Sequence, residues 1–84
     1  MMHLMPVVAW RLRVADLLKK EGLSRYKVAK HMERHFGVTS AHVYVVLNGK
    51  AAPSWALLQK LHAALEALLG REVGVEELIE VVRE

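Results

Sequence analysis

The sequence predicts an all-α fold, a compact domain of five short helices, and three observations support this. The chain has 84 residues, enough for one domain and too few for two. Its glycines divide it into short segments and lie at Gly22, Gly37, Gly49, Gly70 and Gly74. Between them the apolar residues recur at the three- and four-residue spacing of helices. We therefore expect a single domain over residues 1–84, with a core within about 10–82 and no sheet.

The first two helices are predicted from apolar spacing and from capping residues. In residues 10–21, one helical face carries the apolar side chains Trp10, Val14, Leu17 and Leu18. Gly22 suits a C-cap, because glycine enters the left-handed region at little cost. Ser24 then offers an N-cap for a second helix, with Val28 and Met32 facing inward.

The third helix is predicted between Gly37, which ends the second helix, and the pair Asn48-Gly49. Thr39 can cap it, and its buried stripe is expected to consist of Val43, Val46 and Leu47. Residues 42–47 are rich in valine and tyrosine, which favours a strand on propensity alone. The run shows no alternation and the rest of the chain offers no strand partner, so we expect a helix.

Two further helices complete the prediction. Pro53-Ser54 opens the fourth helix, with Ser54 as its N-cap. Its apolar stripe is expected to be Leu58, Leu61, Leu65 and Leu68. A fifth, shorter helix is expected over about residues 75–83, with one side carrying Val75, Leu78, Ile79 and Val82.

Composition argues against several classes of protein. The chain has no cysteine, so no disulfide or thiolate metal site is possible and a reducing compartment is favoured. Residues 1–6 lack the basic start and long apolar run of a signal peptide, and no apolar run approaches the roughly 20 residues that span a bilayer. We expect a soluble, cytoplasmic protein with no membrane partner.

No catalytic or metal site is expected. The sequence shows no nucleophile–base spacing and no glycine-rich phosphate loop, so it does not indicate an enzyme. His31 and His35 have the i, i+4 spacing that can hold a metal on one helix face. A third ligand would have to be His42, and solvated histidines are the preferred interpretation, with no cofactor.

Charge is distributed unevenly along the chain. Residues 1–50 contain nine Lys or Arg against three Asp or Glu, whereas residues 51–84 contain three against six. The basic half is therefore the half suited to a polyanion.

The basic half also carries a family resemblance. Two short helices are joined by a glycine turn, and the second ends in Leu47-Asn48-Gly49-Lys50. This pattern resembles the phage repressor/Cro (XRE-type) family of helix-turn-helix proteins, and the resemblance covers about residues 14–79. It implies a lambda repressor-like fold that binds double-stranded DNA, with the helix of about residues 39–48 in the major groove.

Two departures from the family pattern alter this expectation. The family has about three residues where this chain has seven, residues 30–36. Four extra residues make about one helical turn, so we expect an extended second helix. Arg25 stands where the family usually has glutamine, and a phosphate contact is expected there instead.

The expected DNA contacts fall into two groups. The exposed face of the third helix and the resemblance together predict base contacts from Ser40, Ala41, Tyr44 and Val45. Phosphate contacts are expected from Ser24, Arg25, Lys27, Thr39, His42, Asn48 and Lys50.

The function expected from these features is a transcriptional regulator, a homodimeric repressor. Its dimer surface is expected in the fourth-to-fifth helix region, at Val73, Val81 and Val82. No sensor domain fits in this length, so control would come from abundance or from a regulatory protein partner. The alternative is a helix-turn-helix-fold protein-interaction module, antitoxin-like or a partner of a phage factor, with weak or no DNA binding. The apolar Val45 and the extra turn motivate it.

Overall fold

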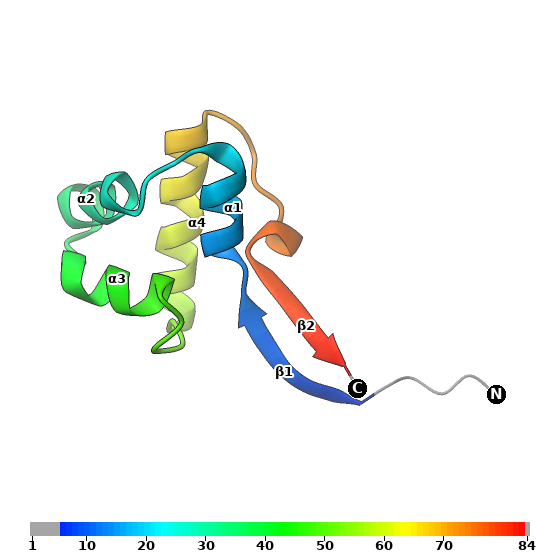
Figure 1. Cartoon of the computed structure of the whole chain (residues 1–84). Coiled ribbons are helices and arrows are strands. Elements are labelled where there is room, and N and C mark those ends of the chain that lie inside the picture. Colours follow the sequence, from blue (N-terminus) through cyan, green and yellow to red (C-terminus); the bar gives the residue numbers. More distant parts are fainter. Residues whose placement is uncertain (1–5, 84) are drawn as a thin grey trace.

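The computed structural model describes residues 6–83, in which four α-helices form a body and two strands form a ribbon that extends from it (Figure 1). The elements in chain order are β1 (Val7–Leu12), α1 (Val14–Glu21), α2 (Arg25–Phe36), α3 (Ser40–Leu47), α4 (Trp55–Leu69), the 3₁₀ turn η1 (Val75–Glu77) and β2 (Ile79–Arg83). The domain is therefore compact and mostly helical, with a small antiparallel sheet built from its two ends.

The expectation of an all-α, five-helix fold is wrong at both ends of the chain. The segment expected as a fifth helix is the short turn η1 followed by strand β2, and the first helix begins at Val14 rather than at Trp10. Trp10 instead lies in β1, where it pairs with Val81 of β2. Strand-favouring residues at both ends stabilise this pairing. Because the partners are far apart in sequence, local periodicity does not reveal it.

The capping residues predicted from the sequence are confirmed. The hydroxyls of Ser24, Thr39 and Ser54 each accept a hydrogen bond from the backbone N–H three residues later, at 3.1, 3.3 and 3.1 Å. Gly22 and Gly37 end α1 and α2 in the left-handed conformation, with φ of 66° and 67°. Helix α2 runs for 12 residues and includes the whole of residues 30–36.

A single apolar core joins the four helices to the segment before β2. It consists of Val14, Leu17, Leu18, Val28, Ala29, Met32, Val43, Val46, Leu47, Leu57, Leu61, Ala64, Leu65, Val73 and Leu78. Val73 is buried in this core, so its expected place on a dimer surface is wrong. The stripe expected for the fifth helix is also wrong, because Val75 is 65% exposed while Leu78 is buried. A strand and a 3₁₀ turn do not place these residues on one face.

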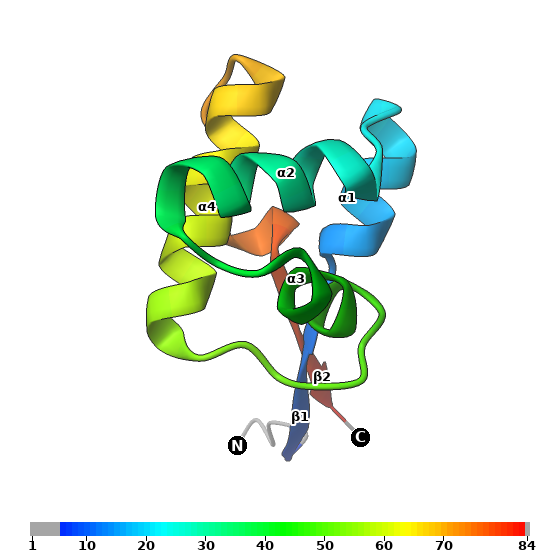
Figure 2. The same ribbon diagram turned by 90° about the vertical axis from the view of Figure 1, so that its left-hand side faces the viewer.

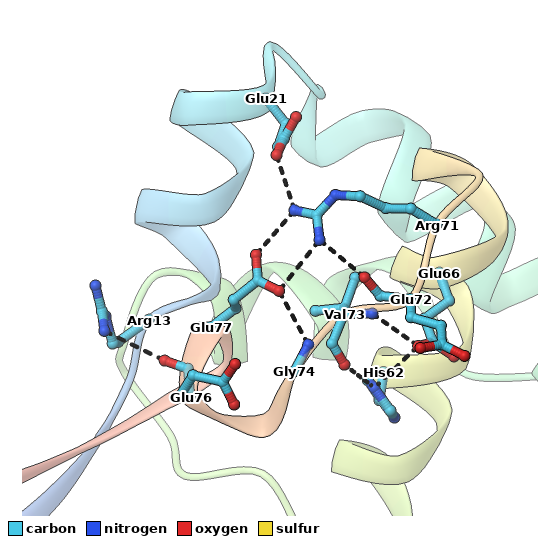
Figure 3. A network of polar contacts seen from close by, with 10 residues as sticks. All are labelled: Arg13, Glu21, His62, Glu66, Arg71, Glu72, Val73, Gly74, Glu76 and Glu77. Carbon is cyan, nitrogen blue, oxygen red and sulfur yellow. Dashed lines mark hydrogen bonds and ion pairs between the residues drawn. The ribbon is translucent and has the colours of Figure 1, made fainter.

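Arg71 connects the segment after α4 to the rest of the body (Figure 3). Its Nη2 donates to Glu21 Oε1 of α1 and to Glu77 Oε1 of η1, both at 2.8 Å. The other oxygen of Glu77 accepts from the Gly74 N–H at 2.9 Å. Glu66 Oε2 accepts from the Val73 N–H at 2.8 Å. These contacts hold the polypeptide between α4 and β2 in place.

The Glu77 contacts predict a specific acid sensitivity. Hydrogen bonds from Arg71 and from the Gly74 N–H lower the pKa of Glu77 from 4.5 to about 2. The carboxylate therefore stabilises the fold above pH 4.5, and this contribution is lost as the pH falls from 4.5 towards about 2. A Glu77→Gln variant should melt at a lower temperature at neutral pH and lose less stability across this range. Thermal melts at a series of pH values measure this.

The matched control for that experiment is Glu76→Gln, one residue away. Glu76 takes part in the network through its backbone carbonyl, which accepts from Arg13 Nη1 at 3.2 Å, and the substitution keeps that group. Its melting curves should follow those of the wild type. Identical pH profiles for Glu77→Gln and the wild type would contradict the assignment.

Candidate nucleic-acid interface

Helices α2 and α3 lie next to each other on one side of the body, joined by a short turn at Gly37 (Figure 2). Thr39 caps α3 and orients its first turn. The buried side of α3 consists of Val43, Val46 and Leu47, as the sequence predicts. This packing leaves the opposite side of α3 on the surface of the protein.

The four residues expected to contact bases differ in accessibility. Ala41 is exposed and Val45 is 39% exposed. Tyr44 is half-buried and packs against the core. Ser40 is half-buried, and its hydroxyl donates to Glu33 Oε2 at 2.9 Å. Ala41 and Val45 are therefore the two residues of this group that lie open to a ligand, and neither has a polar side chain.

Glu33 is a residue of this surface that the sequence analysis missed. It lies in the second half of α2, and Lys30 Nζ is 3.6 Å from its Oε1. The hydrogen bond from Ser40 and the charge of Lys30 lower its pKa, so the group is ionised at neutral pH. The sequence does single out this residue, because Glu33 is the only acidic residue between Gly22 and Lys50. A carboxylate beside α3 repels phosphates and can accept a hydrogen bond from a cytosine amino group.

The cationic residues of the interface lie at the start of α2 and just after α3. Arg25 Nη1 donates to Asn48 Oδ1, so these two expected phosphate contacts are brought together. With its oxygen engaged, Asn48 offers its amide N–H groups to a ligand. Lys27 is exposed in the first turn of α2. Lys50 is exposed, and its N–H donates to the Val45 carbonyl at 3.0 Å.

The remaining expected phosphate contacts lie at the helix N-termini. The Ser24 and Thr39 hydroxyls are engaged as caps of α2 and α3, while His42 has an exposed side chain in the first turn of α3. Helix N-termini favour anions through their free N–H groups and the helix dipole. All seven expected phosphate-contact residues thus lie within residues 24–50, here called the α2–α3 unit, which comprises the two helices, their caps and the turn after α3.

The side chains of α2 also include a histidine pair. The rings of His31 and His35 are 4.3 Å apart. Partial burial, together with the charges of His35 and Arg34, lowers the pKa of His31. Within residues 6–83 no group of three or more His, Asp or Glu side chains is arranged to hold a metal ion, and none of the helices there has the length and hydropathy to cross a membrane.

A comparison with protein-family models, with curated proteins and with solved structures finds no match. The candidate interface is therefore described from its own residues. It combines a short helix with exposed small and apolar side chains, two capped helix N-termini, the cations Arg25 and Lys27 in the first turn of α2, and Lys50 just after α3.

Proposed function

We propose that the protein is a sequence-specific transcriptional regulator, a homodimeric repressor that inserts α3 into the major groove of double-stranded DNA. The observation that carries this proposal is the exposed side of α3, on which Ala41 and Val45 lie open, with the cations Arg25 and Lys50 at the end of the helix where Arg25 donates to Asn48. The major groove admits one α-helix. Small side chains on the inserted helix let it approach the base edges closely.

The chemistry of α3 supports a particular mode of recognition. Val45 cannot form hydrogen bonds and is suited to a thymine methyl group. Arg25, Lys27 and Lys50 are suited to phosphates, which orient a protein on the duplex without reading its sequence. Ser40 donates to Glu33, so in this proposal the pair acts together, with the carboxylate accepting from a base amino group.

Two copies are part of the proposal because one domain of this size makes few base contacts. Specific operator affinity requires a larger interface than one small module supplies. A two-fold dimer would place its two α3 helices in successive major grooves, about 34 Å apart.

Substituting Lys27 by Gln tests the phosphate contacts. Each phosphate contact contributes about 0.9 to the slope of log K against log salt, so the variant should bind duplex more weakly at low salt and with a slope reduced by about that amount. Fluorescence anisotropy with a labelled duplex over a salt series measures it. Lys60→Gln, an exposed lysine on α4, is the control and should retain the wild-type slope.

The rival function is a protein-interaction module that keeps this fold without binding DNA. The negative charge of Glu33 beside α3 and the exposed Val45 favour it. The same titration separates the two, because an interaction module would show no salt-dependent retention of duplex even at low salt. That result would overturn the proposed regulator.

A further inference from the structure

We propose that two copies of the chain associate through an apolar surface on the side of the molecule that carries the ribbon. This surface, here called the tryptophan patch, consists of Trp10, Pro53, Trp55, Leu58, Val75 and Ile79. These residues line two adjoining open hollows that share Trp55, Leu58 and Ile79. The proposal concerns the homodimer part of the proposed function and makes no use of DNA binding.

The ribbon of β1 and β2 supplies one half of the patch. Its two faces differ in polarity, and the apolar face belongs to the patch. Trp10 is paired with Val81, and Leu12 with Ile79, and paired residues point to the same face of an antiparallel sheet. One face of the ribbon is therefore entirely apolar at these positions. The other face carries the ion pair between Arg11 and Glu80.

The helical body supplies the other half. Trp55 is the first residue of α4 and is 70% exposed, and Trp10 on the ribbon is 66% exposed. Val75 of η1 is 65% exposed and Val81 of β2 is 44% exposed. Of the large exposed apolar side chains of residues 6–83, these four thus gather on this side, while Tyr26 and Val45 lie on the α2–α3 unit and Val8 lies at the irregular start of β1.

The area fits a protein interface. An aromatic side chain buries about 150–250 Å², so the two indoles together expose roughly 200–350 Å² at the exposures given above. Each partner of a standard interface buries about 800 Å². The indoles alone thus account for a quarter or more of that area, and tryptophan is enriched among the residues that dominate binding energy.

The charge of the patch favours a second copy of the chain over a charged partner. The charged residue among those lining the hollows is Arg11, and its side chain lies on the other face of the ribbon, bound to Glu80. His62 lines one hollow and donates to the Val73 carbonyl at 2.7 Å. In a two-fold dimer the same patch occurs on both partners, and an uncharged patch meets its copy without repulsion.

Dimerisation through the patch would also stabilise the ribbon. Within residues 6–83 the sheet has two strands, and an isolated two-stranded ribbon is marginally stable in water. The α2–α3 unit lies on the other side of the helical body from the ribbon (Figure 1). A dimer formed through the patch therefore leaves both α3 helices uncovered.

The position of the tryptophan patch revises the dimer surface that the sequence predicts. Of the three valines expected there, Val73 is in the core and Val82 pairs with Ala9 on the opposite face from Trp10. Val81 lies beside the patch on the apolar face.

The test is sedimentation of the protein without DNA over a series of concentrations, combined with tryptophan fluorescence. The chain contains two tryptophans, and both are in the patch, so burial of the patch should shift their emission to shorter wavelength as the dimer forms. Trp55→Glu should weaken dimerisation by about 30-fold or more. It should still fold, because Ser54 is kept as the cap and an acidic residue suits the first turn of a helix.

Two further variants make the result decisive. Trp10→Thr removes the other indole with a residue that strands accept, and it should weaken dimerisation even if Trp55→Glu failed to fold. Tyr26→Glu removes an exposed aromatic outside the patch, 61% exposed on α2, and should leave dimerisation unchanged. A monomeric wild type, or a dimer with unshifted emission that survives both tryptophan variants, would overturn the proposal. Because no DNA is present, neither result depends on the proposed DNA binding.

Discussion

Replacing Ala41 by Glu is expected to weaken specific DNA binding by about 100-fold or more, with the domain still folded. Ala41 is the second residue of α3 and is exposed, so a longer, negatively charged side chain there would meet phosphates and base edges directly. Like-charge juxtaposition at an interface costs several kcal/mol. A carboxylate in the first turn of a helix is favourable to the helix itself. Binding and stability should therefore separate.

The control for this variant comes from a matching position in another helix. Ala56 is the second residue of α4, is exposed, and follows a serine cap as Ala41 follows a threonine cap. Ala56→Glu adds the same charge at the same helical position outside the α2–α3 unit. Anisotropy with a duplex selected from a random pool should show lost affinity for Ala41→Glu alone, and thermal melts should show both variants folded. Equal affinities for the two variants would exclude α3 from the contact.

Replacing Met32 by Ala is expected to lower the free energy of unfolding by about 2–5 kcal/mol. Met32 is fully buried and is among the largest such side chains, and its neighbours from α3 and α4 include Val43 and Leu61. Since a small domain has a total stability of about 5–15 kcal/mol, this loss could unfold much of the protein. Urea denaturation followed by circular dichroism measures it.

Met32→Leu serves as the control, because volume-conserving apolar substitutions usually cost less than about 1.5 kcal/mol. A similar small loss for Met32→Ala would mean that α2 does not pack on α3 and α4 as described. The experiment also bears on function. Met32 lies on α2 and packs towards α3 and α4, so it belongs to the contacts that orient α3.

The helices of the body could be predicted because their signals are local. Ser24, Thr39 and Ser54 cap helices within three residues of themselves. Gly22 and Gly37 mark helix ends through their own backbone conformation. The valine-rich segment of α3 was correctly predicted as a helix despite its strand propensity, because it lacks the alternation of apolar and polar residues that marks a half-buried strand.

The ribbon could not be predicted from such signals. Arg11 pairs with Glu80 across 69 positions of sequence, and no pattern within either segment identifies its partner. Treated alone, each end has apolar residues whose spacing fits a helix, and this spacing led to the wrong prediction of helices at both ends. The two segments form strands because they pair with each other.

The exposure of several candidate site residues could be predicted, whereas the contacts Ser40–Glu33 and Arg25–Asn48 could not. The resemblance implied which residues of α2 and α3 face a ligand, and Ala41, Val45, Lys27 and Lys50 are exposed. Glu33, which engages Ser40, lies within residues 30–36, where the sequence departs from the pattern that it resembles. A resemblance gives no expectation for a residue that its pattern does not contain.

The most direct test of the central claim is an amide chemical-shift titration of the labelled protein with a duplex enriched from a random pool. If α2 and α3 form the DNA-binding surface, the shifts should concentrate in residues 24–28 and 39–50 and fade as salt is raised. The tryptophan patch should be unaffected by the duplex. Failure to enrich any duplex at low salt, or shifts confined to the ribbon and α4, would contradict the account.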